Sequence, residues 1–201
     1  LIGENLNIAY NKIRCGYMDF RSEIYGSTFN SILGDNTLYS IGVQSMAINA
    51  EKVFFSYACV LKSDNDIQRT VVVTCDKNTK RVLSTNEVTS SGVTKLHGNN
   101  INKMVYNGDL YLYVSALYSP YCIVEKVSGN SFTLQQTIKY VGTKTTSGTY
   151  VIDKDNGLIY LYYGAPTMTM LKFNLPSLSQ TGDISISDSD IVEEISLNID
   201  S

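Results

Sequence analysis

A repeated strand–turn–strand pattern constrains the fold more than any other feature of the sequence. The repeats are MAINAEKVFFSY from Met46, MVYNGDLYLYVS from Met104 and YVIDKDNGLIYLYY from Tyr150. In each, two runs of β-branched and aromatic residues flank a turn containing Asn, Asp or Gly, which tolerate left-handed or Asx-turn backbone. The pattern therefore predicts three β-hairpins.

Two further strands are expected after each hairpin. The third strands begin at Arg69, Tyr121 and Met168, and the fourth strands lie in RVLSTNEV, FTLQQTIKY and DIVEEISL. Successive units start 58 and then about 46 residues apart, close to the spacing of four-stranded propeller blades. We predict an all-β, β-propeller-like fold of about three four-stranded antiparallel blades, preceded by an N-terminal β segment.

The predicted organisation is an N-terminal β segment, 1–41, and three repeat units, 42–91, 92–148 and 149–201. A propeller ring closes with about four to eight blades, so three units need completion. The N-terminal segment, further sequence beyond this chain, or assembly of three chains would each complete the ring, and stacking as a sandwich is the alternative. The stretch 177–190 is interpreted as a loop or an exposed acidic segment.

Composition agrees with strands and disfavours several classes of partner. Hydrophobic residues make up 43% of the chain and charged residues 17%, with 15 Tyr, a balance typical of pleated rather than helical structure. The net charge of −3 disfavours nucleic acid, which requires a basic surface. The sequence has neither a bilayer-spanning apolar run nor a signal-peptide pattern, so we expect no membrane insertion. It begins at Leu1, as a processed product or a piece of a longer protein would.

The cysteines and the single histidine give no metal signature. The four cysteines are widely spaced and no CxxC pair or His cluster accompanies them, so we predict neither metal nor cofactor. Cys59 and Cys75 fall on neighbouring predicted strands, which leaves a disulfide open. Buried thiols are the simpler interpretation.

Two loops carry the candidate binding residues. His97 lies in the HGNN segment before the second unit, where a propeller places loops near its central channel, and Asn99 and Asn100 follow it. A histidine that hydrogen-bonds neighbouring loops is the favoured alternative, because no catalytic partner is evident. Tyr118 and Tyr121 flank Ser-Pro in a turn and form either an aromatic platform for sugar or a plug at the blade edge.

Acidic residues raise two further interpretations. Asp153 and Asp155, in DKDNG, match the start of a calcium loop but lack its closing Glu, so a hairpin turn explains them better. A polysaccharide-degrading enzyme needs two convergent carboxylates, which sequence does not reveal. No nucleophile elbow, P-loop or dinucleotide fingerprint is present, so the sequence leans away from an enzyme.

GVQSMAINAEKVFFSY, VVVTCDKNTKRVL and LHGNNINKMVYNGDLYLYVS, within residues 42–115, resemble the propeller module of phage receptor-binding and tail-fibre proteins. The resemblance implies a virion appendage outside the cell, commonly trimeric, that binds host surface polysaccharide or teichoic acid. By position, the family's blade-start loop falls on His97 to Asn100. The chain departs from the family in having too few blades.

The resulting expectation is a non-enzymatic recognition or structural module of a virion tail appendage that binds host cell-surface glycan. The alternative is a polysaccharide-degrading enzyme, sialidase- or lyase-like, or its accessory domain. A module that only scaffolds neighbouring proteins is the third.

Overall fold

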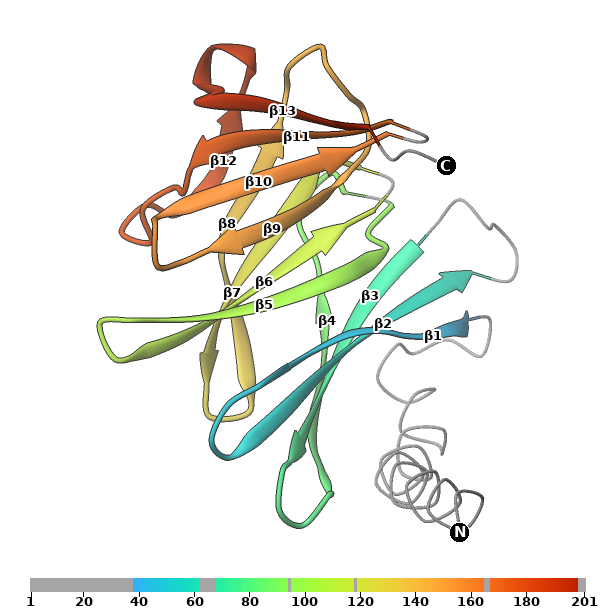
Figure 1. The fold of residues 1–201 in the computed structure, drawn as a ribbon. Coiled ribbons are helices and arrows are strands. Elements are labelled where there is room, and N and C mark those ends of the chain that lie inside the picture. Colours follow the sequence, from blue (N-terminus) through green and yellow to red (C-terminus); the bar gives the residue numbers. More distant parts are fainter. Residues whose placement is uncertain (1–37, 62–67, 94, 118, 165–166, 199–201) are drawn as a thin grey trace, which may run out of the picture.

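The structure is a computed structural model that describes residues 38–61, 68–93, 95–117, 119–164 and 167–198. The described chain is all-β and contains three sheets of four or five strands (Figure 1). Its one helical element is the short 3₁₀ turn η1 (Asp188–Asp190). No helix in the described ranges is long and apolar enough to cross a bilayer. The predicted fold class is therefore confirmed at the level of all-β structure.

The first sheet is a meander in which consecutive strands pair antiparallel. Its strands are β1 (Leu38–Ile48), β2 (Lys52–Leu61), β3 (Gln68–Asp76) and β4 (Val82–Val88). The β1–β2 turn closes because the Asn49 side chain accepts hydrogen bonds from the backbone N–H groups of Glu51 and Lys52, at 2.9 and 2.7 Å. The first predicted hairpin and the two strands after it are present.

The second sheet repeats the meander and adds a fifth strand. It contains β5 (Gly98–Tyr106), β6 (Asp109–Ala116), β7 (Tyr121–Ser128), β8 (Ser131–Tyr140) and β12 (Gly182–Ile186). The β5–β6 turn holds Asn107 and Gly108 at positive φ, 51° and 85°, as the Asn-Gly signal predicts. The prediction of a loop over 177–190 is wrong at Gly182–Ile186, because these residues form β12. This strand pairs parallel with the free edge of β8.

The third sheet holds the remaining repeat unit. Its order is β13 (Glu193–Asn198), β11 (Thr167–Asn174), β10 (Leu158–Tyr163) and β9 (Thr149–Asp153), all antiparallel. The chain leaves this sheet after β11, pairs with the second sheet as β12, and returns through η1 to β13. All three predicted hairpins and the third and fourth strands of each unit are therefore confirmed.

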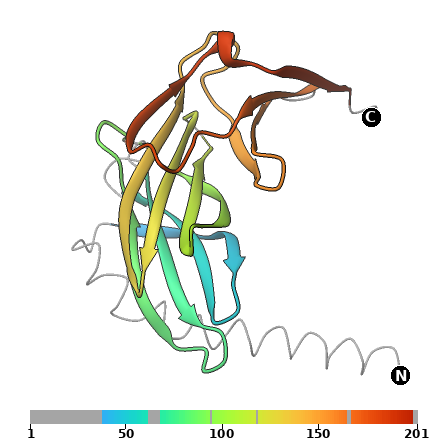
Figure 2. The same cartoon turned by 90° about the vertical axis from the view of Figure 1, so that its left-hand side faces the viewer.

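Figure 2 shows the same ribbon turned by 90°. Two apolar cores join the three sheets. The first core joins Phe54 and Val72 of the first sheet to Leu112 and Ile123 of the second. The second core lies on the opposite face of the second sheet, where Tyr113, Tyr140 and Val124 pack against Tyr150, Leu161 and Phe173 of the third. Alternation along the strands of the second sheet supplies both cores, since successive side chains point to opposite faces.

The described residues form an open stack rather than a closed ring. The first strand of the second sheet, β5, packs on β1 and β2, and β9 packs on β5, β6 and β7. The predicted boundary at Gly42 falls inside β1. The rest of the predicted N-terminal β segment, residues 1–37, lies outside the described residues.

The two cysteines considered for a disulfide lie on adjacent strands but at opposite ends of the pair. Cys59 on β2 is opposite Arg69, whereas Cys75 on β3 is opposite Val53. A disulfide needs Cα atoms within about 7 Å, which this register does not provide. Both side chains are instead buried in one apolar cluster of the first sheet. The register thus excludes a bond between these two residues.

Candidate functional site

His97 and Gly98 connect the start of β5 to the first sheet. The Nδ1 atom of His97 lies 2.9 Å from Oε1 of Gln68, and burial lowers the pKa of the imidazole. The Gly98 N–H donates to the Thr70 hydroxyl at 2.7 Å, and the Ser56 hydroxyl donates to the Gly98 carbonyl at 2.6 Å. A Cβ at Gly98 would lie 2.5 Å from the Thr70 side chain. The close approach therefore requires glycine here.

Asn99 and Asn100 connect the same strand to the third sheet. The Asn99 amide donates to the Thr149 hydroxyl at 2.6 Å, and the Asn100 amide donates to the Tyr150 carbonyl at 2.8 Å. The HGNN segment is thus a junction at which all three sheets are hydrogen-bonded together. These bonds fit the structural alternative weighed for His97, and the ligand role of the three side chains stays a prediction.

Tyr121 lines a groove at the outer edge of the second sheet, whereas Tyr118 lies outside the described residues. The strand register builds the floor of this groove. Tyr121 on β7 is opposite Lys139 on β8, which is in turn opposite Ser185 on β12. Directly paired residues share a face of a sheet. Tyr121, Lys139 and Ser185 therefore form one row across three strands.

A second row lies two residues along the strands on the same face. Thr137 on β8 is opposite Asp183 on β12, and the Thr137 hydroxyl lies 2.6 Å from that of Ser90. Ser91 and Gly92, from the turn after β4, form the facing wall, and the hollow measures about 360 Å³. We call this hollow the Tyr121 groove. It combines an aromatic ring, hydroxyls, an ammonium and a carboxylate.

Lys139 gives the groove its electrostatic character. Its Nζ atom lies 5.2 Å from the centroid of the Tyr121 ring, within the range of a cation–π contact. The side chain is exposed, so it can swing from the ring to an incoming anion at low cost. The groove therefore offers an aromatic face and a movable cation side by side.

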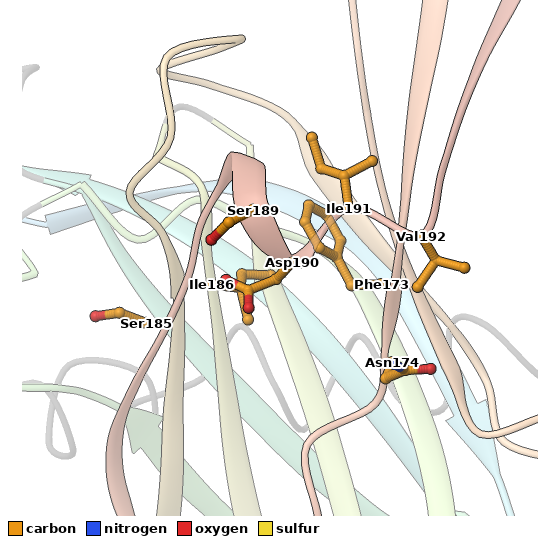
Figure 3. A pocket seen from close by; sticks show the side chains of 8 residues that line it. All are labelled: Phe173, Asn174, Ser185, Ile186, Ser189, Asp190, Ile191 and Val192. Carbon is orange, nitrogen blue, oxygen red and sulfur yellow. The ribbon is translucent and has the colours of Figure 1, made fainter.

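A second hollow, about 420 Å³, lies on the other side of β12. Figure 3 shows that its lining comes from the end of β11, from β12 and from the segment around η1. Phe173 is buried and contributes to the second core. Asp190 already accepts hydrogen bonds from the N–H and hydroxyl of Ser187, both at 2.8 Å, which lower the pKa of its carboxyl. The one carboxylate among the described residues of this hollow is therefore already bonded to Ser187.

The acidic residues considered for calcium are used in local turns. The Asp153 carboxylate accepts from the backbone N–H and side-chain amide of Asn156, at 3.3 and 2.8 Å, and Asp155 pairs with Lys154 at 3.0 Å. In the parts of the chain that the structure describes, no three His, Cys, Asp or Glu residues are grouped as a metal site would require. The turn interpretation accounts for both aspartates.

Glu125 is a buried carboxyl that the sequence analysis did not single out. It lies on β7 opposite Leu112 of the first core, with 4% of its surface exposed. Desolvation raises the pKa of its carboxyl to about 7. Its position between two β-sheets rather than in a hollow indicates a structural group.

Of the residues that line the Tyr121 groove, Tyr121 was predicted from the sequence as a binding residue, whereas Lys139 and Ser185 were not. Asp183 appears in the sequence only as part of an acidic stretch. The alternation in Thr137-Ile138-Lys139 and in Asp183-Ile184-Ser185 was the available signal, because period-two patterns place the polar residues on one face. This alternation does not reveal that β12 pairs with β8.

Comparison of the chain with protein-family models, with curated protein sequences and with solved structures finds no match. The function must therefore be inferred from the groove's own geometry.

Proposed function

We propose that this chain is a non-enzymatic recognition module that binds glycan on a host cell surface through the Tyr121 groove. The observation that carries the proposal is the row of Tyr121, Lys139 and Ser185 across three paired strands. A sugar presents an apolar ring face and a rim of hydroxyls. Aromatic rings stack on the first, and hydroxyl, amide and charged side chains bond the second.

The residues that line the groove support recognition rather than catalysis. Sites held on strands keep their geometry better than sites on loops, and each row of the groove lies on adjacent hydrogen-bonded strands. No histidine or cysteine is found among the described residues that line the groove. One carboxylate, Asp183, lines it, whereas glycoside hydrolysis normally uses two.

The wider setting that we propose follows the resemblance to phage receptor-binding proteins. The chain would be part of a virion tail appendage whose ligand is a host polysaccharide or teichoic acid, and the stacked sheets would be blades of a propeller completed by further sheets. Apolar residues on the outer face of the third sheet support a continued stack. Val151, 38% exposed, pairs there with Tyr160, and Tyr162 pairs with Met170.

A homotrimer is part of this proposal. Light scattering on the purified chain should give three times the mass of one chain, and a concentration-independent monomer would remove the trimer without affecting the groove.

The binding function is tested by an array of bacterial capsular polysaccharides and teichoic acids probed with the full chain. We expect selective binding that Tyr121→Ala and Lys139→Ala each weaken by about fivefold or more, since an aromatic or charged contact contributes roughly 1 kcal/mol or above. Lys154→Ala, in the exposed β9–β10 turn, is the matched control. Its binding should equal that of the native chain.

Two outcomes would contradict the proposal. One is an array with no binding to any surface glycan. The other is binding that survives both groove substitutions in variants whose circular dichroism spectra match the native chain.

A further inference from the structure

The Tyr121 groove contains two opposite charges without ion-pair partners. Lys139 contacts the Tyr121 ring, and Asp183 lies on β12 at the other side of β8. Neither residue belongs to any of the ion pairs formed within the described ranges. Opposite charges in one hollow ordinarily pair, so their separation here needs a reason.

Strand register and the cation–π contact keep the two charges apart. Asp183 is opposite Thr137, two residues along β8 from Lys139. Strands lie about 4.8 Å apart and rise about 3.3 Å per residue, which puts the two backbone positions about 8 Å from each other. The ammonium then leans over Tyr121 on β7, away from β12. The positive charge therefore lies at one side of the groove and the negative charge at the other.

This arrangement selects against ligands of a single charge. A purely acidic glycan would be attracted by Lys139 and repelled by Asp183. A purely cationic glycan would be attracted by Asp183 and repelled by Lys139. A ligand that carries both charges is attracted by both side chains. The repulsion of singly charged ligands adds to the specificity of the groove.

We propose that the groove recognises a zwitterionic glycan, in which an amino sugar neighbours an acidic sugar or a phosphate. The acidic group binds Lys139, the ammonium of the amino sugar binds Asp183, and Ser185 bonds the hydroxyls between them. This assignment rests on the proposed glycan-binding function and names the ligand class for the same groove.

Three oligosaccharides of equal length test the charge requirement in titration calorimetry with the full chain. They are a hyaluronan hexasaccharide, which is acidic, the same hexasaccharide after N-deacetylation, which is zwitterionic, and a chitosan hexasaccharide, which is cationic. The pH is kept below the pKa of the amino sugar. Exposed charge pairs each contribute roughly 0.2 to 1 kcal/mol, so the zwitterion should bind about 1.4- to fivefold more tightly than either of the others.

Charge-neutral variants separate the contribution of Asp183 from that of Lys139 to binding of the zwitterion. Asp183→Asn should reduce binding of the zwitterion to the level of the acidic parent and leave the parent unchanged or slightly improved. Lys139→Gln should weaken both. Asp155→Asn, in the β9–β10 turn, carries the same charge change outside the groove and should alter neither.

Equal or tighter binding of the acidic parent by the native chain would overturn the zwitterion assignment and leave glycan binding standing. Zwitterion preference that persists in Asp183→Asn would also overturn it. Failure to bind any of the three would overturn the assignment too, and the glycan array then decides the proposed function separately.

Discussion

Individual buried ionisable residues make the folding stability of the chain depend on pH. Glu125 is the clearest case because desolvation raises the pKa of its carboxyl to about 7 from 4.5. The folded chain thus favours the protonated form more than the unfolded chain does. The stability that this group contributes is fully present below pH 4.5 and is lost as the pH rises to about 7.

Glu125→Gln should therefore be more stable than the native chain above pH 7 and nearly equal to it at pH 4. Each pKa unit corresponds to about 1.4 kcal/mol, so the rise from 4.5 to about 7 predicts a gain of about 3.5 kcal/mol at pH 8 in urea unfolding. Taking the difference between the two proteins cancels the other titrating groups. Glu51→Gln, which removes an exposed carboxyl from the β1–β2 turn, is the control variant. A native chain whose stability rises from pH 5 to 8 relative to Glu125→Gln would contradict the assignment.

At the level of elements, β12 is the unexpected strand and the one that shapes the groove. It leaves the third sheet to pair with β8, and Ile186 at its end is buried in the second core. Two neighbouring glutamines of β8 hold the segment before it. The Gln136 amide donates to the carbonyls of Ser177 and Gln180 at 2.6 and 3.0 Å, and Gln135 bonds the same segment from a less buried position.

Gln136→Ala should loosen β12 and weaken glycan binding together. Removing a fully buried donor costs about 1 to 3 kcal/mol of unfolding free energy, and the loss of order in β12 should expose its amides to hydrogen exchange. Thr133→Ala, at an exposed position of the same strand, is the control and should change the unfolding free energy by about 0.5 kcal/mol or less. Unchanged exchange at Ile184 in Gln136→Ala would show that these bonds do not secure the strand.

The local sequence pattern predicted most of the strands but did not predict how β12 pairs. The twelve strands of the three four-stranded units each carry β-branched or aromatic residues between turn residues. Neighbours in sequence pair with one another, except that β11 pairs with β13 across the intervening β12. The short β12, which lies within a Ser- and Asp-rich segment, pairs with a free edge supplied by another unit. Tyr121 was predictable as an aromatic beside a turn, although the structure shows it half-buried against the first core. Its row with Lys139 and Ser185 depends on the pairing of β12 with β8.

Over the whole molecule, the second sheet is shared by both cores and should make the described stack unfold as one unit. Phe54 and Leu161 are fully buried, the first in the first core and the second in the second core. Phe54→Ala and Leu161→Ala should each destabilise the chain by about 2 to 5 kcal/mol. Each should lower the midpoint of a single calorimetric transition. Two separate transitions, with each variant shifting only one, would show that the sheets fold independently.

The Tyr121 groove depends on that stack. Its floor belongs to the second sheet, and one wall is the turn after β4, the last strand of the first sheet. A crystal structure of the chain with the tightest-binding glycan of the array tests this most directly. We predict a sugar ring in contact with Tyr121, with Lys139 turned to its acidic group. A sugar bound only in the hollow beside Phe173, or at the HGNN junction, would contradict the assignment of the groove.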